Sequence, residues 1–128
     1  MSRNLKTVST SDYDAVVTTV QAYVDGLKSG SVADLSKAFH GDAVMYGFTN
    51  GALIGGPITN LYDFVEKNGK ATEVRTRIDI LAITPTTAVV RVDMEKDVIG
   101  LDYTDFHSLL KQDGTWRTIA KVYHAYEG

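Results

Sequence analysis

The segment that decides the fold lies near the end of the chain and reads YTDFHSLLKQDGTWRTIAKVYH (residues 103–124). Polar and apolar side chains alternate on both sides of residues 112–114, which is typical of two antiparallel strands joined by a short loop. A three-residue loop, in which a type I turn is followed by Gly114 in the left-handed conformation, pairs Lys111 with Thr115. This loop sets the expected register of the whole hairpin.

The three-residue loop predicts which side chains of the hairpin share a face. Counting back from the loop, Asp105 pairs with Lys121, and paired residues point to the same side of a sheet. One face then carries Tyr103, Asp105, His107, Lys121 and Tyr123. The other face carries Thr104, Phe106, Ser108, Leu110, Trp116, Thr118, Ala120 and Val122. A loop of two or four residues would move Asp105 and Lys121 to opposite faces, so the grouping depends on the loop.

Upstream of this hairpin the sequence predicts three helices. Residues 13–27 place apolar side chains at helical spacing, with a capping box that begins at Ser11. A second, short helix follows the cap residue Ser31 and is expected to end near His40. Pro57 suits the first turn of a third helix.

The remaining segments are predicted to be strands. A hairpin over residues 43–54 is expected to turn at Asn50 and Gly51, and residues 73–84 and 88–98 alternate like the final hairpin. Helices come first and strands follow as a meander, which is typical of an α+β domain with an antiparallel sheet. We expect the three helices to cover a long, curved sheet and to enclose a pocket.

Composition excludes several classes of protein. The chain has 128 residues, a net charge of −3, no cysteine and 44% hydrophobic residues, which suits a single domain over residues 1–128. No apolar run approaches the ~20 residues of a membrane helix, and residues 1–14 do not resemble a secretory signal. The absence of cysteine favours a cytoplasmic location, and mild acidity argues against nucleic acid as a partner. Residues 1–10 are expected to form a loosely ordered extension.

Four stretches carry a resemblance to a known family. They are residues 23–30 (YVDGLKSG), 38–43 (AFHGDA), 51–57 (GALIGGP) and 113–123 (DGTWRTIAKVY). Together they resemble the nuclear transport factor 2-like superfamily, in its SnoaL-like and putative lumazine-binding branch. The resemblance extends over about residues 13–124. Gly41 departs from the pattern, because relatives usually carry proline at that position.

The resemblance implies a cone-shaped, cystatin-like α+β fold with a deep pocket between the sheet and the helices. Such proteins are commonly homodimers through the sheet, and they bind small organic ligands in the pocket. The superfamily includes isomerases, dehydratases, cyclases and epoxide hydrolases, as well as members with no known reaction. The resemblance therefore implies a fold and a pocket, and it does not select one activity.

The polar face of the final hairpin supplies most of the candidate catalytic residues. Asp105 can act as a general base, and Lys121 can orient a substrate or stabilise a developing charge. Tyr103 and Tyr123 can donate hydrogen bonds to a carbonyl or an enolate. The alternative is a structural salt bridge between Asp105 and Lys121. A nearby cation lowers the pKa of a carboxyl group, which favours ligand binding over base catalysis.

Histidines and other tyrosines form a second group of candidates. His40 is either a catalytic acid–base group near the pocket mouth or a residue that binds carbonyls at a helix end. His107 is a candidate ligand contact on the polar face. Tyr23, Tyr46 and Tyr62 either line the pocket or pack in the core. The three histidines lack the spacing of a zinc or iron site, so we expect no metal, and the sequence implies no cofactor.

Three functions remain open at the level of sequence. The first is binding of a small, partly apolar organic molecule in the pocket. The second is a cofactor-independent isomerase, cyclase or dehydratase that acts on a carbonyl compound. The third is a protein-interaction domain, which predicts a fully packed cone and an exposed apolar sheet face.

Overall fold

The structure, a computed structural model, describes residues 8–127 and contains three helices and six strands in that range. The helices are α1 (Thr10–Ser29), α2 (Val32–Ser36) and α3 (Thr59–Asn68). The strands are β1 (Phe39–Thr49), β2 (Ala52–Pro57), β3 (Arg75–Ile83), β4 (Thr87–Glu95), β5 (Tyr103–Gln112) and β6 (Thr115–Ala125).

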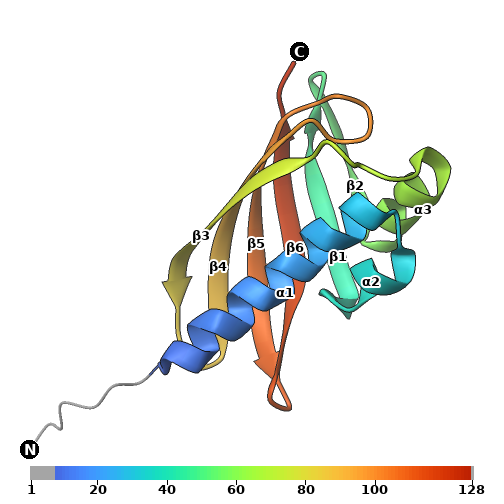
Figure 1. Cartoon of the computed structure of the whole chain (residues 1–128). Coiled ribbons are helices and arrows are strands. Elements are labelled where there is room, and N and C mark those ends of the chain that lie inside the picture. The colour runs from blue at the N-terminus through green and yellow to red at the C-terminus, as the bar shows by residue number, and fades with distance from the viewer. Residues whose placement is uncertain (1–7, 128) are drawn as a thin grey trace, which may run out of the picture.

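The strands form one sheet in the order β2-β1-β6-β5-β4-β3, and the helices lie against one of its faces (Figure 1). Neighbouring strands are antiparallel except for β1 and β6, which pair in parallel. The chain leaves the β1–β2 hairpin, crosses to the far edge through α3, and returns strand by strand until β6 meets β1. The α+β class is confirmed, with a mixed sheet where the sequence predicted a wholly antiparallel one.

Side-chain caps set where the first two helices begin. Ser9 is the N-cap of α1, and its hydroxyl accepts a hydrogen bond from the backbone N–H of Asp12 at 3.2 Å. The predicted capping box at Ser11 was therefore wrong by two residues. Ser31 caps α2 as predicted, because its hydroxyl accepts from the backbone N–H of Asp34 at 3.1 Å.

Two further helix boundaries differ from those predicted. The second helix ends at Ser36, and His40 belongs to β1, since strand pairing of β1 begins at Phe39. Pro57 is the last residue of β2 and pairs with Val44, so α3 begins only after it. In both places, residues whose local sequence predicted a helix pair in a strand instead.

Residues 1–7 of the predicted N-terminal extension lie outside the described residues, whereas Ser9 and Thr10 are the cap and first residue of α1. Within residues 8–127, no helix is both long enough and apolar enough to cross a membrane.

Both predicted hairpins are present, and both turn on two residues. Asn50 and Gly51 have φ values of 50° and 76°, which fits a type I′ turn between β1 and β2. Asp113 and Gly114 have φ values of 51° and 77° and make the same kind of turn between β5 and β6. The three-residue loop predicted for the final hairpin was therefore wrong.

A β-bulge in β6 compensates for the shorter turn. Leu109 pairs with Thr118, but Ser108 pairs with Ala120, so Ile119 is an extra residue without a partner in β5. One extra residue reverses the alternation of faces along β6. The turn and the bulge together shift the predicted register by two residues, which leaves the faces beyond the bulge as predicted.

The bulge decides which side chains of the hairpin share the inner face. Beyond it, His107 pairs with Lys121 and Asp105 pairs with Tyr123, so the predicted polar face is retained with different partners. Between the turn and the bulge, the prediction was wrong for two residues of β6, which were expected on the outer face and lie on the inner face. Both are buried: Trp116 and Thr118.

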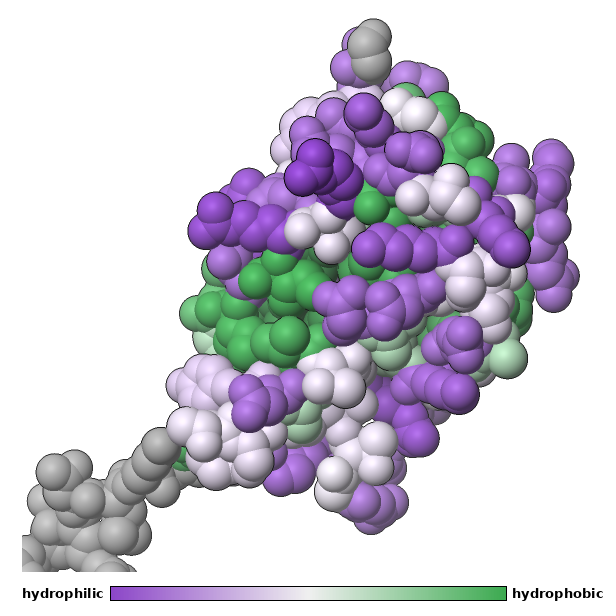
Figure 2. All heavy atoms as spheres, in the orientation of Figure 1, coloured by the Kyte–Doolittle hydropathy of each residue, from purple (hydrophilic) through white to green (hydrophobic). Residues whose placement is uncertain are grey.

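The hydrophobic core fills the space between α1 and the inner face of the sheet. In the first half of α1, Val16 and Val20 pack against Val90, Leu109 and Trp116. In Figure 2 hydrophilic side chains cover most of the helical side of the molecule, and a hydrophobic area lies beside α1, over β3.

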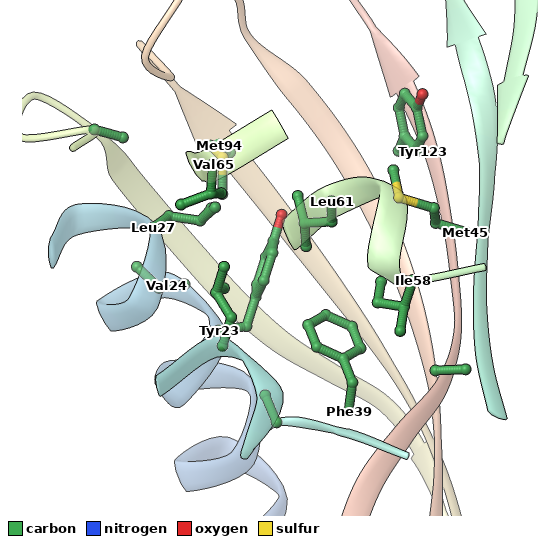
Figure 3. Close-up of a cluster of buried hydrophobic side chains, with 14 of the residues drawn as sticks. Tyr23, Val24, Leu27, Phe39, Met45, Ile58, Leu61, Val65, Met94 and Tyr123 are labelled. Carbon is green, nitrogen blue, oxygen red and sulfur yellow. The ribbon is translucent and has the colours of Figure 1, made fainter. Parts of the chain in front are cut away.

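The second half of α1 belongs to a larger cluster that reaches the other two helices (Figure 3). Tyr23 and Leu27 of α1 pack in this cluster with Leu61 of α3 and Met45 of β1. Because α3 lies over the β1–β2 end of the sheet (Figure 1), this cluster surrounds the site described below.

Gly47 of β1 makes room for an aromatic ring on the next strand. It pairs with Tyr123 of β6. A Cβ at position 47 would lie 2.5 Å from Cγ and 2.6 Å from Cδ1 of the Tyr123 ring. The missing side chain lets this ring lie across β1.

The variant Gly47→Ala is therefore expected to reduce the free energy of unfolding by about 1–3 kcal/mol, because the new methyl group overlaps the Tyr123 ring and backbone. Urea unfolding measures the change. Gly41→Ala on the same strand is the matched control, since a Cβ there meets nothing within 4 Å. The control should stay within about 1 kcal/mol of the parent protein. Equal losses in the two variants would contradict this account.

Candidate functional site

A cavity of about 320 Å³ lies between the helices and the inner face of the sheet, a size typical of small-molecule sites. Three residues of the cavity wall are labelled in Figure 3: Leu27 of α1, Leu61 of α3 and Tyr123 of β6. The apolar wall residues are Leu27, Met45, Ile54, Leu61, Phe64, Val65, Ala71, Met94, Val98 and Ile99. The residues with polar side-chain groups are Tyr23, Thr49, Asn60, Asp97, Tyr103, Lys121 and Tyr123.

Pairing of strands β1, β6 and β5 places the reactive groups side by side on the inner face. Met45, Lys121 and His107 occupy one row across these strands. Gly47, Tyr123 and Asp105 occupy the next row. Lys121 and Tyr123 line the cavity, while Asp105 and His107 lie behind it.

Asp105 is a buried carboxylate, with only 1% of its surface exposed. Its Oδ2 accepts hydrogen bonds from Tyr23 Oη at 3.0 Å and from His107 Nε2 at 3.3 Å. Burial raises the pKa of Asp105, but the charge of Lys121 and the two hydrogen bonds outweigh that effect and hold the pKa below its ordinary value. Asp105 is therefore ionised and a weak base, as its predicted proximity to Lys121 required.

His107 is fully buried and neutral. Burial is the largest influence on its pKa and lowers it, although the neighbouring Asp105 opposes that shift. A neutral imidazole with its proton on Nε2 donates to the Asp105 carboxylate. His107 thus holds the carboxylate in place and has no direct contact with the cavity.

Lys121 brings an amino group to the cavity wall, although the residue is only 4% exposed. Its Nζ lies 4.4 Å from the centre of the Tyr123 ring and 5.8 Å from that of Tyr23. None of the ion pairs within residues 8–127 joins Lys121 to a carboxylate, so the predicted salt bridge with Asp105 is not formed.

Burial lowers the pKa of Lys121, and the charge of Asp105 opposes that shift only in part. The Tyr123 ring also favours the ammonium form, by about 0.5–2 kcal/mol. Withdrawing an ammonium group from water costs several kcal/mol, which is the larger effect. A neutral amine is therefore more accessible at Lys121 than at a solvent-exposed lysine.

Asp97 is a site residue that the sequence analysis missed. It lies in the loop between β4 and β5, and its Oδ2 accepts a hydrogen bond of 2.6 Å from the Tyr103 hydroxyl. Its Oδ1 accepts from the backbone N–H groups of Ile99 and Leu101, at 3.0 Å and 2.8 Å, which shapes the loop. The available signal was the pair Asp97 and Gly100, because Asp and Gly three residues apart are typical of a turn. Burial and the Asp97 carboxylate raise the pKa of Tyr103, so its hydroxyl stays protonated.

The structure places three predicted site residues away from the cavity. His40 lies on β1 and contacts Gln112 Oε1 through Nε2 at 3.1 Å. Tyr46 is 46% exposed on the outer face of the sheet. Tyr62 of α3 packs against the ring of Phe39, 6.4 Å between centres. Of the other candidates, Tyr23, Tyr103, Lys121 and Tyr123 line the cavity together. Within residues 8–127, no cluster of three or more acidic, histidine or cysteine side chains is arranged to hold a metal ion.

Comparison with known proteins identifies relatives over nearly the whole chain. The family described as "Putative lumazine-binding" matches residues 11–124. A relative from Cladobotryum sp, named aldolase FrzH, is 37% identical over 121 residues, which is 94% of this chain and 97% of that protein.

Solved structures agree with this assignment. A nuclear transport factor 2-like protein of unknown function from Shewanella baltica OS155 is 30% identical, with a TM-score of 0.87 over 96% of this chain and all of the other. A second such protein, from Methylobacillus flagellatus KT, is 36% identical, with a TM-score of 0.86 over 94% of this chain and 96% of the other. A ketosteroid isomerase-like protein from Erwinia carotovora atroseptica SCRI1043 is 14% identical, with a TM-score of 0.72 over 94% of this chain and all of the other, and shares the fold alone.

The variant Tyr23→Phe is expected to reduce the free energy of unfolding by about 1.5–3 kcal/mol, because it removes a hydrogen bond to a buried charge. Chemical unfolding followed by Trp116 fluorescence measures the loss. Tyr62→Phe is the matched control, since burial alone raises the pKa of Tyr62 and no hydrogen bond contributes. A loss in the control as large as in Tyr23→Phe would contradict the role of the hydroxyl.

The same variant should also unfold at higher pH during acid titration. The folded state holds the pKa of Asp105 below its ordinary value of 3.8. Stability from Asp105 is therefore present above the unfolded-state pKa and is lost as pH falls through the folded-state pKa. Without the Tyr23 hydroxyl the folded-state pKa lies closer to 3.8, so Asp105 contributes less stability at neutral pH and the less stable variant reaches its acid-unfolding midpoint at a higher pH than the parent protein.

Proposed function

Because the chain belongs to the putative lumazine-binding family of nuclear transport factor 2-like proteins, we propose that its cavity binds a small, largely apolar carbonyl compound. We propose further that it catalyses an aldol-type reaction, in which a carbon–carbon bond next to a carbonyl group forms or breaks. The observation that carries the proposal is the buried amino group of Lys121 in the wall of an apolar cavity.

The polar groups of the cavity suit the charge that an aldol reaction develops. An enolate or alkoxide oxygen is stabilised by preorganised donors in a site that excludes water. Lys121 can supply such donors through its N–H groups, whereas the Tyr103 hydroxyl donates its one proton to Asp97 and offers its oxygen as an acceptor that orients the substrate. Tyr23 is held in the same way by Asp105. Asp105 does not line the cavity, so we assign it a positioning role through Tyr23.

Three observations favour aldol chemistry over the alternatives. The low pKa of Asp105 disfavours a reaction that depends on a strong carboxylate base, as a simple isomerisation does. The Cladobotryum relative, 37% identical, is named an aldolase. A pure interaction domain would have a filled cone, whereas this one contains a cavity of about 320 Å³.

Without cysteine, the chain suits the reducing cytoplasm, where we propose that it acts.

The proposal predicts that the protein exchanges the α-protons of a ketone. In heavy water with cyclohexanone, the parent protein should incorporate deuterium faster than buffer or heat-denatured protein, as NMR measures. Asp105→Asn should slow the exchange by about 10²-fold or more, because Tyr23 loses its anionic partner. Asp42→Asn, an exposed carboxylate on β1, is the control and should keep the parent rate.

The outcomes test the aldol function and the positioning role of Asp105 separately. If neither cyclohexanone nor a panel of β-hydroxy ketones reacts faster with parent protein than in buffer, the aldol function fails. If the parent protein is active and Asp105→Asn retains its full rate, the positioning role of Asp105 is wrong.

We also infer a homodimer formed through the outer face of the sheet. Strand pairing places Tyr46, Val122 and Phe106 in one row across β1, β6 and β5, and these side chains are 46%, 54% and 42% exposed. Arg91 and Asp93 form an ion pair at the side of this row, with Nε–Oδ2 at 3.1 Å. A two-fold axis would bring apolar side chains together and each charge near its opposite, as a self-complementary interface requires.

Val122→Glu should convert the dimer to a monomer, because two carboxylates would be buried at the centre of the interface. Native mass spectrometry measures the oligomeric mass and also detects any small molecule that copurifies. Val17→Glu is the matched control, since Val17 is a 39% exposed valine on α1, away from the outer face. A monomeric parent protein, or a dimer that survives Val122→Glu, would refute the interface.

A further inference from the structure

Lys121 differs in its surroundings from other lysines of the chain. It is 4% exposed, its amino group reaches a cavity wall, and no carboxylate of residues 8–127 forms an ion pair with it. Lys111 offers a contrast, because its Nζ lies 2.9 Å from Asp12 Oδ1 in a conventional ion pair. Lysines 28, 37, 67, 70 and 96 are exposed to water. Lys121 alone among these combines shelter from water with access to an internal space.

Aromatic rings set the direction of the Lys121 side chain. The Tyr123 ring lies 4.4 Å and the Tyr23 ring 5.8 Å from Nζ, measured to the ring centres. Gly47 leaves the room that the Tyr123 ring occupies beside it. On the neighbouring strand, His107 and Asp105 are buried and do not line the cavity, whereas Lys121 does.

We propose that Lys121 is a covalent catalytic residue whose Nζ forms an imine with the carbonyl carbon of a ketone or aldehyde held in the cavity. The inference rests on the proposed aldol function and deepens it by naming the reacting atom. The neutral amine adds to the carbonyl carbon to give a carbinolamine. Both hydrogens of the amine are transferred to the former carbonyl oxygen, which leaves as water while a C=N bond forms, and one proton from the solvent then gives the protonated imine.

An imine resolves a chemical difficulty that the site otherwise poses. Asp105 and Asp97 are both occupied by hydrogen bonds from tyrosines, so neither is free to act as a strong base toward an unactivated ketone. A protonated imine makes the neighbouring C–H bonds far more acidic than a ketone does, so a weak base suffices. Transfer of that proton to a water molecule gives an enamine, whose carbon attacks a second carbonyl, and the alkoxide formed there takes the proton back. Water then hydrolyses the imine and returns the free amine.

The neighbouring hydroxyl groups are placed to serve this sequence. The hydroxyls of Tyr103 and Tyr23 stay protonated and donate their single protons to Asp97 and Asp105, so their oxygens are acceptors in the cavity wall. Either oxygen can accept a hydrogen bond from the carbinolamine hydroxyl group that leaves as water. The largely apolar remainder of the wall accommodates the hydrocarbon part of the carbonyl compound and limits the access of bulk water.

The diketone 2,4-pentanedione tests the proposal directly. Its reaction with a neutral lysine releases one water and leaves a conjugated enaminone, which absorbs in the near ultraviolet and needs no reducing agent to be stable. The parent protein should gain the mass of one diketone less one water, and peptide mapping should place that adduct on Lys121. Modification of Lys121 should be at least tenfold faster than that of any exposed lysine.

Matched variants complete the experiment. Lys121→Arg keeps a cation on a long side chain but has no amine, so the absorbance and the adduct should disappear while circular dichroism stays that of the parent. Lys111→Arg replaces the lysine of the surface ion pair and should react like the parent. Mapping the parent protein is decisive even if Lys121→Arg does not fold.

Each result decides between the covalent step and the wider function. Absence of an adduct at Lys121, or an adduct formed no faster than on exposed lysines, overturns the imine. If deuterium exchange into cyclohexanone still occurs in that case, the aldol function stands by a noncovalent route. If the adduct forms at Lys121 and no exchange occurs with any ketone, Lys121 stands as an imine-forming residue and the aldol function fails.

Discussion

The structure depends on one costly feature, a carboxylate buried at the centre of the domain. An ionised Asp105 without partners would cost several kcal/mol in this position. Tyr23 from α1 and His107 from the same strand donate hydrogen bonds to it, and the charge of Lys121 on β6 lowers its pKa. Tyr23 links the helix to the sheet through this contact. The hydrogen bond between Tyr23 and Asp105 therefore both fixes α1 against the strands and orients a polar group of the cavity.

Burial acts on the two charged groups of the cluster in different ways. Asp105 has two hydrogen-bond donors and a nearby cation, and its pKa falls below the ordinary value. Lys121 has aromatic rings on its flanks and no ion pair within residues 8–127, and its pKa also falls. The cluster therefore holds an anion behind the cavity wall and a lysine that loses its proton more readily than an exposed lysine does. An ordinary cross-strand salt bridge would have kept both groups charged and inert.

Local sequence patterns were sufficient for the fold class and for most of the polar face. They failed where the outcome depended on pairing between distant strands. Alternation around residues 112–114 grouped Asp105 with Lys121 correctly, but through a loop that does not exist, because the unpaired Ile119 restores the alternation. The parallel pairing of β1 with β6 has no local signal, and it places Tyr46 on the outer face. Asp97 was missed because its role follows from a loop that closes on Tyr103.

Most of the polar groups of the cavity and most of its apolar walls come from separate parts of the chain, although Tyr23 of α1 and Asp97 of the loop after β4 also contribute polar groups. Strands β5 and β6 carry Tyr103, Asp105, Lys121 and Tyr123, and they form a single hairpin. The surrounding walls come mainly from α3, the β1–β2 hairpin and the loop after β4, which gather at one end of the sheet (Figure 1). Substitutions in α3 or in β2 can therefore change the shape of the cavity without changing the β5–β6 pairing that holds Lys121, Tyr123 and Tyr103.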